Sequence, residues 1–165
     1  MPFVAMADAV PGAIASSSEY NKVVDNVEYL NSTLPRGRIG SVSSATSNLT
    51  TTDSVVDSQT VTLVSGRRYR VTASYVYGTT ATNYFFNLRY KAGTTVDTSG
   101  TSFFRIAPNG TASQNTPVTL VGEFVAPSSG SFVIACTCRT GTSTGTIPND
   151  GTNHQKFFAV DDVGL

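Results

Sequence analysis

The residues of this sequence that could perform acid–base or nucleophilic chemistry are few and far apart. A hydrolase needs a nucleophile with a base within reach, or two carboxylates that face each other across a substrate. The single histidine, His154, lies in a predicted loop, and the sequence has neither a serine nucleophile elbow nor a glycine-rich phosphate loop. We therefore expect a non-enzymatic protein with no catalytic residue and no cofactor.

Residues able to bind metal ions are equally sparse. Cys136 and Cys138 lie two residues apart in a predicted strand, so their side chains share a face. Their Cα atoms are then close to the ~7 Å limit for a disulfide, and no second cysteine pair completes a zinc site. Asp161 and Asp162 could bind a cation together with loop carbonyls, but their spacing matches no calcium loop. We expect buried free thiols and no metal.

Charge and hydropathy argue against two classes of partner. The chain has 11 basic and 11 acidic residues, so its formal net charge is +0. Binding to nucleic acid needs a clustered positive surface, and we interpret Arg67, Arg68 and Arg70 instead as a solvated strand face or a contact between subunits. The longest apolar runs fall far short of the ~18–20 residues that span a bilayer, and the opening residues lack the features of a signal peptide. We expect no nucleic-acid partner, no membrane span and synthesis in the cytosol.

One amphipathic helix is predicted near the start of the chain. Ser16 and Glu19 form a capping box, and Pro35 with Gly37 ends the helix. Apolar residues then follow at alternating spacings of three and four, as at heptad positions a and d: Tyr20, Val23, Val27, Leu30 and Leu34, with Val24 widening the stripe. Such a short helix is marginal alone, so the stripe must be covered. It packs either on its own β domain or against copies of itself in a short parallel bundle.

The rest of the chain has the alternating apolar pattern of β-strands. Segments with this pattern, separated by turns rich in Gly, Pro, Ser and Thr, are 59–64, 67–77, 84–90, 102–106, 117–125, 131–140 and 155–163. The pattern predicts a mainly β fold, a jelly-roll-like antiparallel β-sandwich with one N-terminal α-helix. We expect residues 1–35 to form a leader and helix for anchoring or oligomerisation, and residues 38–165 to form the sandwich.

Aromatic residues are frequent in the predicted strands and include two adjacent pairs, Phe85-Phe86 and Phe103-Phe104. In a sandwich one face of each strand meets water, so an adjacent pair should expose one ring. Exposed aromatic surface is typical of interfaces. We predict an interface that includes Phe85, Phe103, Tyr75 and Tyr77; the alternatives are a sugar-stacking platform or strand curvature that buries both rings.

Three stretches of the sequence resemble a known group of proteins. Residues 11–27 (PGAIASSSEYNKVVDNV) resemble the helix opening of small virion proteins from tailed phages of actinobacteria, in which a leader precedes an A-S/T-x-x-E-Y/W-N helix. Residues 50–69 resemble the start of the Thr-rich β domain of these proteins, and residues 157–164 (FFAVDDVG) resemble its last strand. The resemblance implies a virion component, often a homotrimer, of the minor tail, tail-tip, fibre or head-decoration type.

The sequence and the resemblance together lead to one expected function with two alternatives. We expect a structural protein displayed on the surface of a tailed-bacteriophage virion, as a minor tail or tail-tip attachment protein. The alternatives are a capsid decoration (head fibre) protein and a carbohydrate-binding module. The expected partners are further copies of the chain, other virion proteins of the tail or capsid, and a host surface glycan. A long fibre is disfavoured because the sequence has no extended coiled-coil shaft and no collagen-like repeat.

Overall fold

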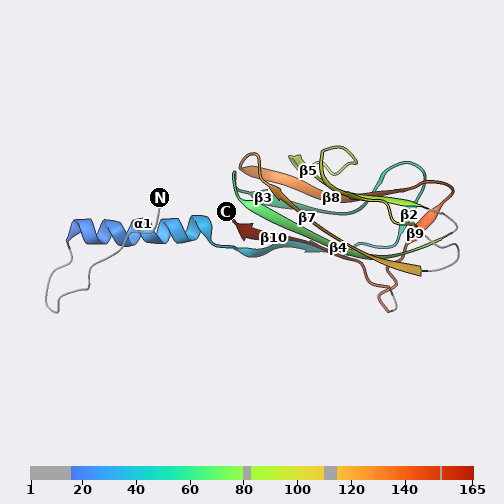
Figure 1. The fold of residues 1–165 in the computed structure, drawn as a ribbon, viewed down its shortest axis with the longest axis horizontal. Helices are drawn as coiled ribbons and strands as arrows, with labels where there is room; N and C mark the ends of the chain where they lie inside the picture. The colour runs from blue at the N-terminus through green and yellow to red at the C-terminus, as the bar shows by residue number, and fades with distance from the viewer. Residues whose placement is uncertain (1–15, 80–82, 110–114, 153) are drawn as a thin grey trace.

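The computed structural model describes residues 16–79, 83–109, 115–152 and 154–165 (Figure 1). The predicted leader at residues 1–15 lies outside these ranges. Within them, a single helix precedes ten strands. The elements are α1 (Ser17–Thr33), β1 (Gly37–Val42), β2 (Ser47–Leu49), β3 (Ser54–Leu63), β4 (Arg68–Thr79), β5 (Tyr84–Ala92), β6 (Thr101–Ile106), β7 (Asn115–Val125), β8 (Gly130–Thr140), β9 (Gly145–Ile147) and β10 (Phe157–Gly164).

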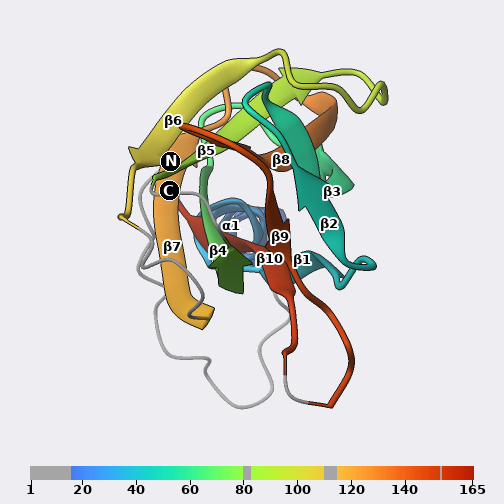
Figure 2. The same cartoon turned by 90° about the vertical axis from the view of Figure 1, so that its right-hand side faces the viewer.

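The strands form two antiparallel sheets that pack face to face. One sheet has 6 strands in the order β1-β10-β4-β9-β2, with β7 paired to β4 as well. The other has 4 strands in the order β3-β8-β5-β6. The end-on view in Figure 2 shows the two layers around a common interior, with α1 behind them. The predicted jelly-roll-like sandwich is confirmed, and the short strand β9 lies between the predicted strands 131–140 and 155–163, where the sequence pattern predicts none.

Aromatic rings from β4 and β5 fill the centre of the sandwich. Tyr75 and Tyr77 of β4 lie opposite Tyr84 and Phe86 of β5, and the ring centroids of Tyr77 and Tyr84 are 4.4 Å apart. All four side chains are at most 1% exposed. Burial of large rings in close contact is the main source of stability for such a core.

A β-bulge in β6 changes which residues face this core. Leu88 pairs with Phe104 but the next residue, Arg89, pairs with Ser102, so Phe103 is an extra residue in its strand. Because a bulge breaks the alternation of faces, both Phe103 and Phe104 turn toward the core and are half-buried against it. Both rings thus turn inward, as in the alternative of strand curvature, and the interface prediction for Phe103 stays a prediction for its partly exposed ring.

The helix projects from one end of the sandwich, along the long axis of the molecule (Figure 1). Its first turn is closed by the predicted capping box: Glu19 N–H donates to Ser16 Oγ (3.3 Å) and Ser16 N–H donates to Glu19 Oε2 (2.9 Å). Its last turn touches the β domain, where Leu165 N–H donates to Thr33 O (3.3 Å). The short strands β2 and β9 lie at the opposite end of the sandwich.

Candidate assembly surface

The apolar stripe of α1 is exposed to solvent. The five residues at the predicted a and d positions, between 39% and 67% exposed, are Tyr20, Val23, Val27, Leu30 and Leu34. We call these five residues the seam; Val24 beside it is half-buried. The alternative in which the stripe packs on the β domain is excluded, because α1 lies beyond the end of the sandwich.

Charged side chains of α1 are placed away from the seam. If Tyr20 takes position a, then Lys22, Asp25 and Glu28 occupy positions c, f and b on the far side of the helix. The flanking e and g positions hold Glu19, Val24, Asn26, Asn31 and Thr33, of which one is charged. Parallel copies of this helix could therefore meet along the seam with little repulsion between like charges.

The helix is attached to the sandwich by a buried ion pair. Arg67 is 1% exposed, and its Nε and Nη2 atoms donate to the two carboxylate oxygens of Asp162 at 2.8 Å each. Arg67 Nη2 also donates to the carbonyl oxygen of Leu34, at the C-terminal end of α1. A cation there is favoured by the partial negative charge of the helix end. Hydrogen bonding to Asp162 raises the pKa of Arg67, which keeps the guanidinium group charged.

The structure thus corrects the interpretation of the arginine cluster. Arg67 is neither solvated nor on a subunit interface, because the turn after β3 directs it inward to Asp162. Arg68 and Arg70 are exposed on β4 and lie 3.9 Å and 2.7 Å from carboxylate oxygens of Glu123.

Two of the four residues predicted to form an aromatic interface are not on the surface. Tyr75 and Tyr77 are each 1% exposed, because the inner face of β4 is the one that meets the second sheet. That prediction is wrong for these two tyrosines. Phe103 is half-buried and packs against Phe124 with ring centroids 4.8 Å apart. Phe85 alone remains on the outer face of β5, half-buried.

The ring of Phe85 is covered by positive charge. The guanidinium carbon of Arg139 lies 4.2 Å from the ring centroid, and that of Arg105 lies 5.7 Å away. Cation–π contact of this kind holds the ring and reduces the flat area on which a sugar could stack. The sugar-stacking alternative therefore gains no support from Phe85.

The side chains considered above as catalytic or metal-binding residues lie at separate places in the structure. Cys136 and Cys138 are buried free thiols, as predicted, and burial raises the pKa of Cys136 to about 12. His154 Nδ1 lies 2.9 Å from Asp150 Oδ2, and Asp161 pairs with Arg38 at 3.2 Å. Among the described residues, no three His, Cys, Asp or Glu side chains lie together as a metal site would require. The same residues contain no helix with the length and apolar composition needed to cross a membrane.

A pocket lies at the end of the sandwich opposite the helix. Its volume is about 430 Å³. Its lining carries no charged side chain and exposes more apolar than polar surface; it consists of Asn48, Leu49, Thr50, Gly78, Thr144, Gly145 and Thr146. An uncharged lining of this kind suits a neutral ligand better than an ion.

Comparison with known proteins gives little further information. No protein-family model matches the chain, and no curated protein matches its sequence. Among solved structures, the fold is similar to one described as "Structure of infectious bursal disease virus Gx strain", with 12% sequence identity and a TM-score of 0.34. The match covers 79% of this chain and 37% of the other, so the chain spans little more than a third of that protein's length. A similarity of this size assigns neither a family nor a function.

Proposed function

We propose that this chain is a structural protein of a tailed-bacteriophage virion, displayed on the particle surface as a minor tail or tail-tip attachment protein. The observation that carries the proposal is the exposed seam on a helix that projects from a self-contained β-sandwich. Residues 1–35 are the anchoring and oligomerising part, and residues 38–165 form the displayed knob. The protein acts by binding and not by catalysis.

The seam is occupied by other copies of the same chain in a parallel bundle. Its residues recur every 3.5 positions on average, which is the repeat of helices that wind around one another. An isolated helix of 17 residues is marginal in water, so burial of the seam is needed to stabilise it. A parallel arrangement places the sandwiches together at one end and leaves the other end of the bundle to bind the particle. We propose three copies.

The resemblance to virion proteins of actinobacterial phages supports this assignment. The first resembling stretch, residues 11–27, contains the capping box and the first half of the seam. In the proposed function these residues begin the oligomerising helix, so sequence pattern and structural role agree. The pocket between Asn48 and Thr146 then lies at the end of the knob that points away from the anchor and could hold a host surface glycan.

The oligomeric state is the first test. Light scattering of the purified full-length chain at micromolar concentration should give three times the 17.4 kDa of one chain. Val27→Asp places a charge in the seam and should give the single-chain mass. Asn21→Asp, which adds the same charge at an exposed position outside the seam, should leave the trimer intact. A monomeric wild-type chain would show that copies of itself do not cover the seam.

The virion assignment is tested separately in purified phage particles. Quantitative mass spectrometry should detect the chain, and immunogold labelling should place it at the tail. Labelling of the head, with hundreds of copies per particle, would instead favour a capsid decoration protein. Absence from particles would overturn the proposal as a whole.

The anchoring role of the first part of the chain is tested by deletion. Removal of residues 1–35 should leave a folded sandwich that no longer joins particles. Continued incorporation of the shortened chain would contradict the assignment of the anchor to residues 1–35.

A further inference from the structure

A lysine and an aspartate meet inside the sandwich, remote from the seam. Lys156 precedes β10 and Asp57 lies in β3, and 3.6 Å separates Lys156 Nζ from Asp57 Oδ2. Both side chains are 0% exposed. Removing two charges from water is costly, and their attraction repays the cost only when further hydrogen bonds satisfy both groups. The hydrogen bonds at this site surround the amino group of Lys156 but satisfy only one oxygen of the Asp57 carboxyl group.

Asp57 points inward by the regular alternation of β3. The pairing of β3 with β8 has no shift from Asp57 to Leu63, so Asp57 shares the inner face of Val61 and Leu63. The bulge in β3 lies just before Asp57, between Val55 and Asp57. Asp57 thus faces the interior opposite the buried thiol of Cys136. The side chain of a residue type that is seldom buried is thereby fixed in the core.

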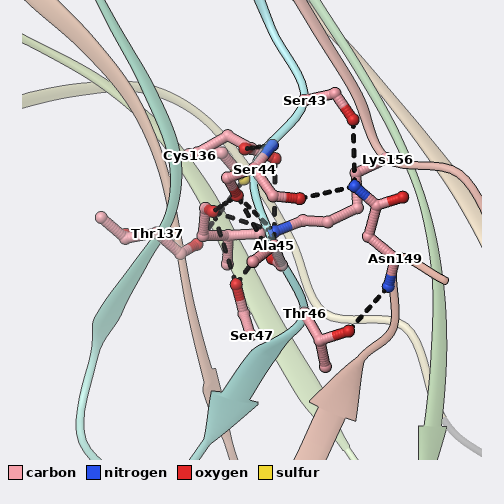
Figure 3. Close-up of polar contacts among 11 residues, drawn as sticks. Ser43, Ser44, Ala45, Thr46, Ser47, Cys136, Thr137, Asn149 and Lys156 are labelled. Carbon is pink, nitrogen blue, oxygen red and sulfur yellow. Dashed lines mark hydrogen bonds and ion pairs between the residues drawn. The ribbon is translucent and has the colours of Figure 1, made fainter. Parts of the chain in front are cut away.

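The amino group of Lys156 is held against the loop between β1 and β2 (Figure 3). Four oxygen atoms lie within hydrogen-bonding distance of Nζ: Ser44 Oγ at 2.8 Å, Ser47 Oγ at 2.9 Å, Ala45 O at 3.0 Å and Val56 O at 3.1 Å. Asn149 fixes the same loop, since its backbone N–H donates to Thr46 Oγ1 at 3.0 Å and its side chain donates to Ser44 O at 2.6 Å. Nζ therefore has little freedom to move.

The carboxyl group of Asp57 is satisfied on one side only. Oδ1 accepts a hydrogen bond from Ser44 N–H at 3.1 Å. Oδ2, the oxygen next to Nζ, has no hydrogen-bond partner among the described residues. Burial lowers the pKa of Lys156, against the opposing charge of Asp57. The nitrogen and the unsatisfied oxygen are thus held together in a fully buried site.

We propose that Lys156 and Asp57 condense to an intramolecular isopeptide bond. A bond forms between Nζ and Cγ of Asp57, and the bond between Cγ and Oδ2 breaks. Of the three protons of the ammonium group, one passes to Oδ2 to give the neutral pair, and a second follows when nitrogen attacks. Oδ2 then leaves as water. The step needs no oxidant, reductant or further reactant.

The surroundings favour this reaction over a lasting ion pair. The Ser44 N–H polarises the carbonyl that is retained, because it bonds Oδ1 and leaves Oδ2 free to depart. The amide product is neutral, so both buried charges and their desolvation penalty disappear. The product N–H can still donate to Val56 O, which lies 3.1 Å from Nζ.

The cross-link would join the two sheets of the sandwich covalently. Asp57 belongs to the sheet of β3 and β8, and Lys156 leads directly into β10 of the other sheet. The bond would enclose residues 57–156 in a covalent loop, which restricts the unfolded chain as a disulfide does. It requires neither thiol chemistry nor an oxidising compartment. This inference is independent of the proposed virion function.

The decisive measurement is the intact mass of the full-length chain under denaturing conditions. The expected mass is lower than that of the sequence by one water molecule, and digestion should give one branched peptide that contains Lys156 and Asp57. A wild-type chain that keeps the full sequence mass after folding and prolonged incubation, with no branched peptide, would overturn the proposal and leave an ion pair.

Variants localise the bond. Lys156→Arg and Asp57→Ala should each have the full mass of their sequence. Lys91→Arg, which changes a lysine paired with Asp97 on the surface, should still lack one water. Retention of the water loss in Lys156→Arg would exclude Lys156 as the nitrogen donor. Because mass is read on denatured protein, the wild-type result stands even if a variant does not fold.

Discussion

The helix exposes apolar side chains to solvent, whereas the sandwich buries charged ones. In α1 the apolar seam lies in water. In the sandwich, charged groups lie inside: Arg67, Asp162, Lys156 and Asp57 are all at most 3% exposed. Each of these charges has a partner of opposite sign within the chain, whereas the seam has no covering element among the described residues. The comparison shows that the sandwich pairs its buried charges within one chain, whereas in the proposed function further copies of the chain cover the seam.

The largest effect separating the two regions should come from truncation of apolar side chains. Phe86 is 0% exposed and contacts the rings of Tyr75, Tyr77 and Tyr84. Phe86→Ala should lower the free energy of unfolding by about 4 kcal/mol through lost burial and a cavity. Leu30→Ala in the seam should change the unfolding of the monomeric sandwich by less than about 0.5 kcal/mol. Urea denaturation measures both; equal losses would mean that the seam is packed on the sandwich.

The buried ion pair at the junction should give the next largest effect. Arg67→Ala leaves Asp162 without its partner, and breaking such a pair costs roughly 3–5 kcal/mol. We expect about 3 kcal/mol, because Asp162 Oδ1 still accepts from Gly164 N–H at 3.0 Å. Arg70→Ala is the control, since its pair with Glu123 is exposed and should contribute at most about 1 kcal/mol. If thermal melts show similar losses of stability for Arg67→Ala and Arg70→Ala, burial does not determine how much each ion pair contributes to stability.

Close packing inside the sandwich predicts a smaller loss. A Cβ atom at Gly122 would meet Phe104 Cβ at 2.8 Å and Phe103 Cε2 at 3.0 Å. Gly122→Ala should therefore force the bulged strand β6 outward and cost about 1–3 kcal/mol. Val121→Ala, at the exposed neighbouring position, should fall within about 0.5 kcal/mol of the wild type. A neutral Gly122→Ala variant would show that β6 does not pack closely on β7.

The helix cap should affect assembly and leave the sandwich unchanged. Ser16→Ala removes the acceptor for Glu19 N–H and should weaken α1 by about 1 kcal/mol. Because α1 carries the seam, the loss should appear as a higher trimer dissociation constant in sedimentation equilibrium. The melting temperature of the sandwich, measured on the monomer, should stay the same.

Acidification should produce the mildest change in the same region. The hydrogen bonds from the backbone and side chain of Ser16 lower the pKa of Glu19 from 4.5. A carboxyl whose pKa is lowered by folding stabilises the helix above its unfolded pKa, and this contribution disappears as pH falls through the folded pKa. Helix content measured by circular dichroism should decline below pH 4.5, and Glu19→Gln should abolish that part of the decline. An unchanged profile would exclude a role for the Glu19 carboxylate.

Features that depend on local sequence were predictable. The capping box of Ser16 and Glu19, the helix bounds and most strands follow from patterns within a few residues. The alternation that joins Tyr75 and Tyr77 to Val71 was also the available signal that both tyrosines are buried.

Features that depend on distant partners were not predictable in the same way. Arg67 is buried because it forms an ion pair with Asp162, which lies 95 residues away in the chain. The inward position of Phe103 depends on a bulge, and a bulge is set by pairing with another strand and not by the composition of its own strand. The lysine–aspartate pair joins residues far apart in the chain and depends on the loop that Asn149 holds, so no spacing in the sequence indicates it.

The route of the chain from α1 into β1 has a mechanical consequence. β1 begins at Gly37, just after the helix, and runs beside β10 in five antiparallel pairs from Gly37↔Asp162 to Val42↔Phe158. Figure 1 shows the chain continuing from α1 along the same long axis. A pull on the helix away from the sandwich therefore acts along β1 and shears its hydrogen bonds with β10 together, whereas a sideways pull would open them one by one. The sandwich should therefore resist a pull along the axis of α1 far better than a sideways force on α1.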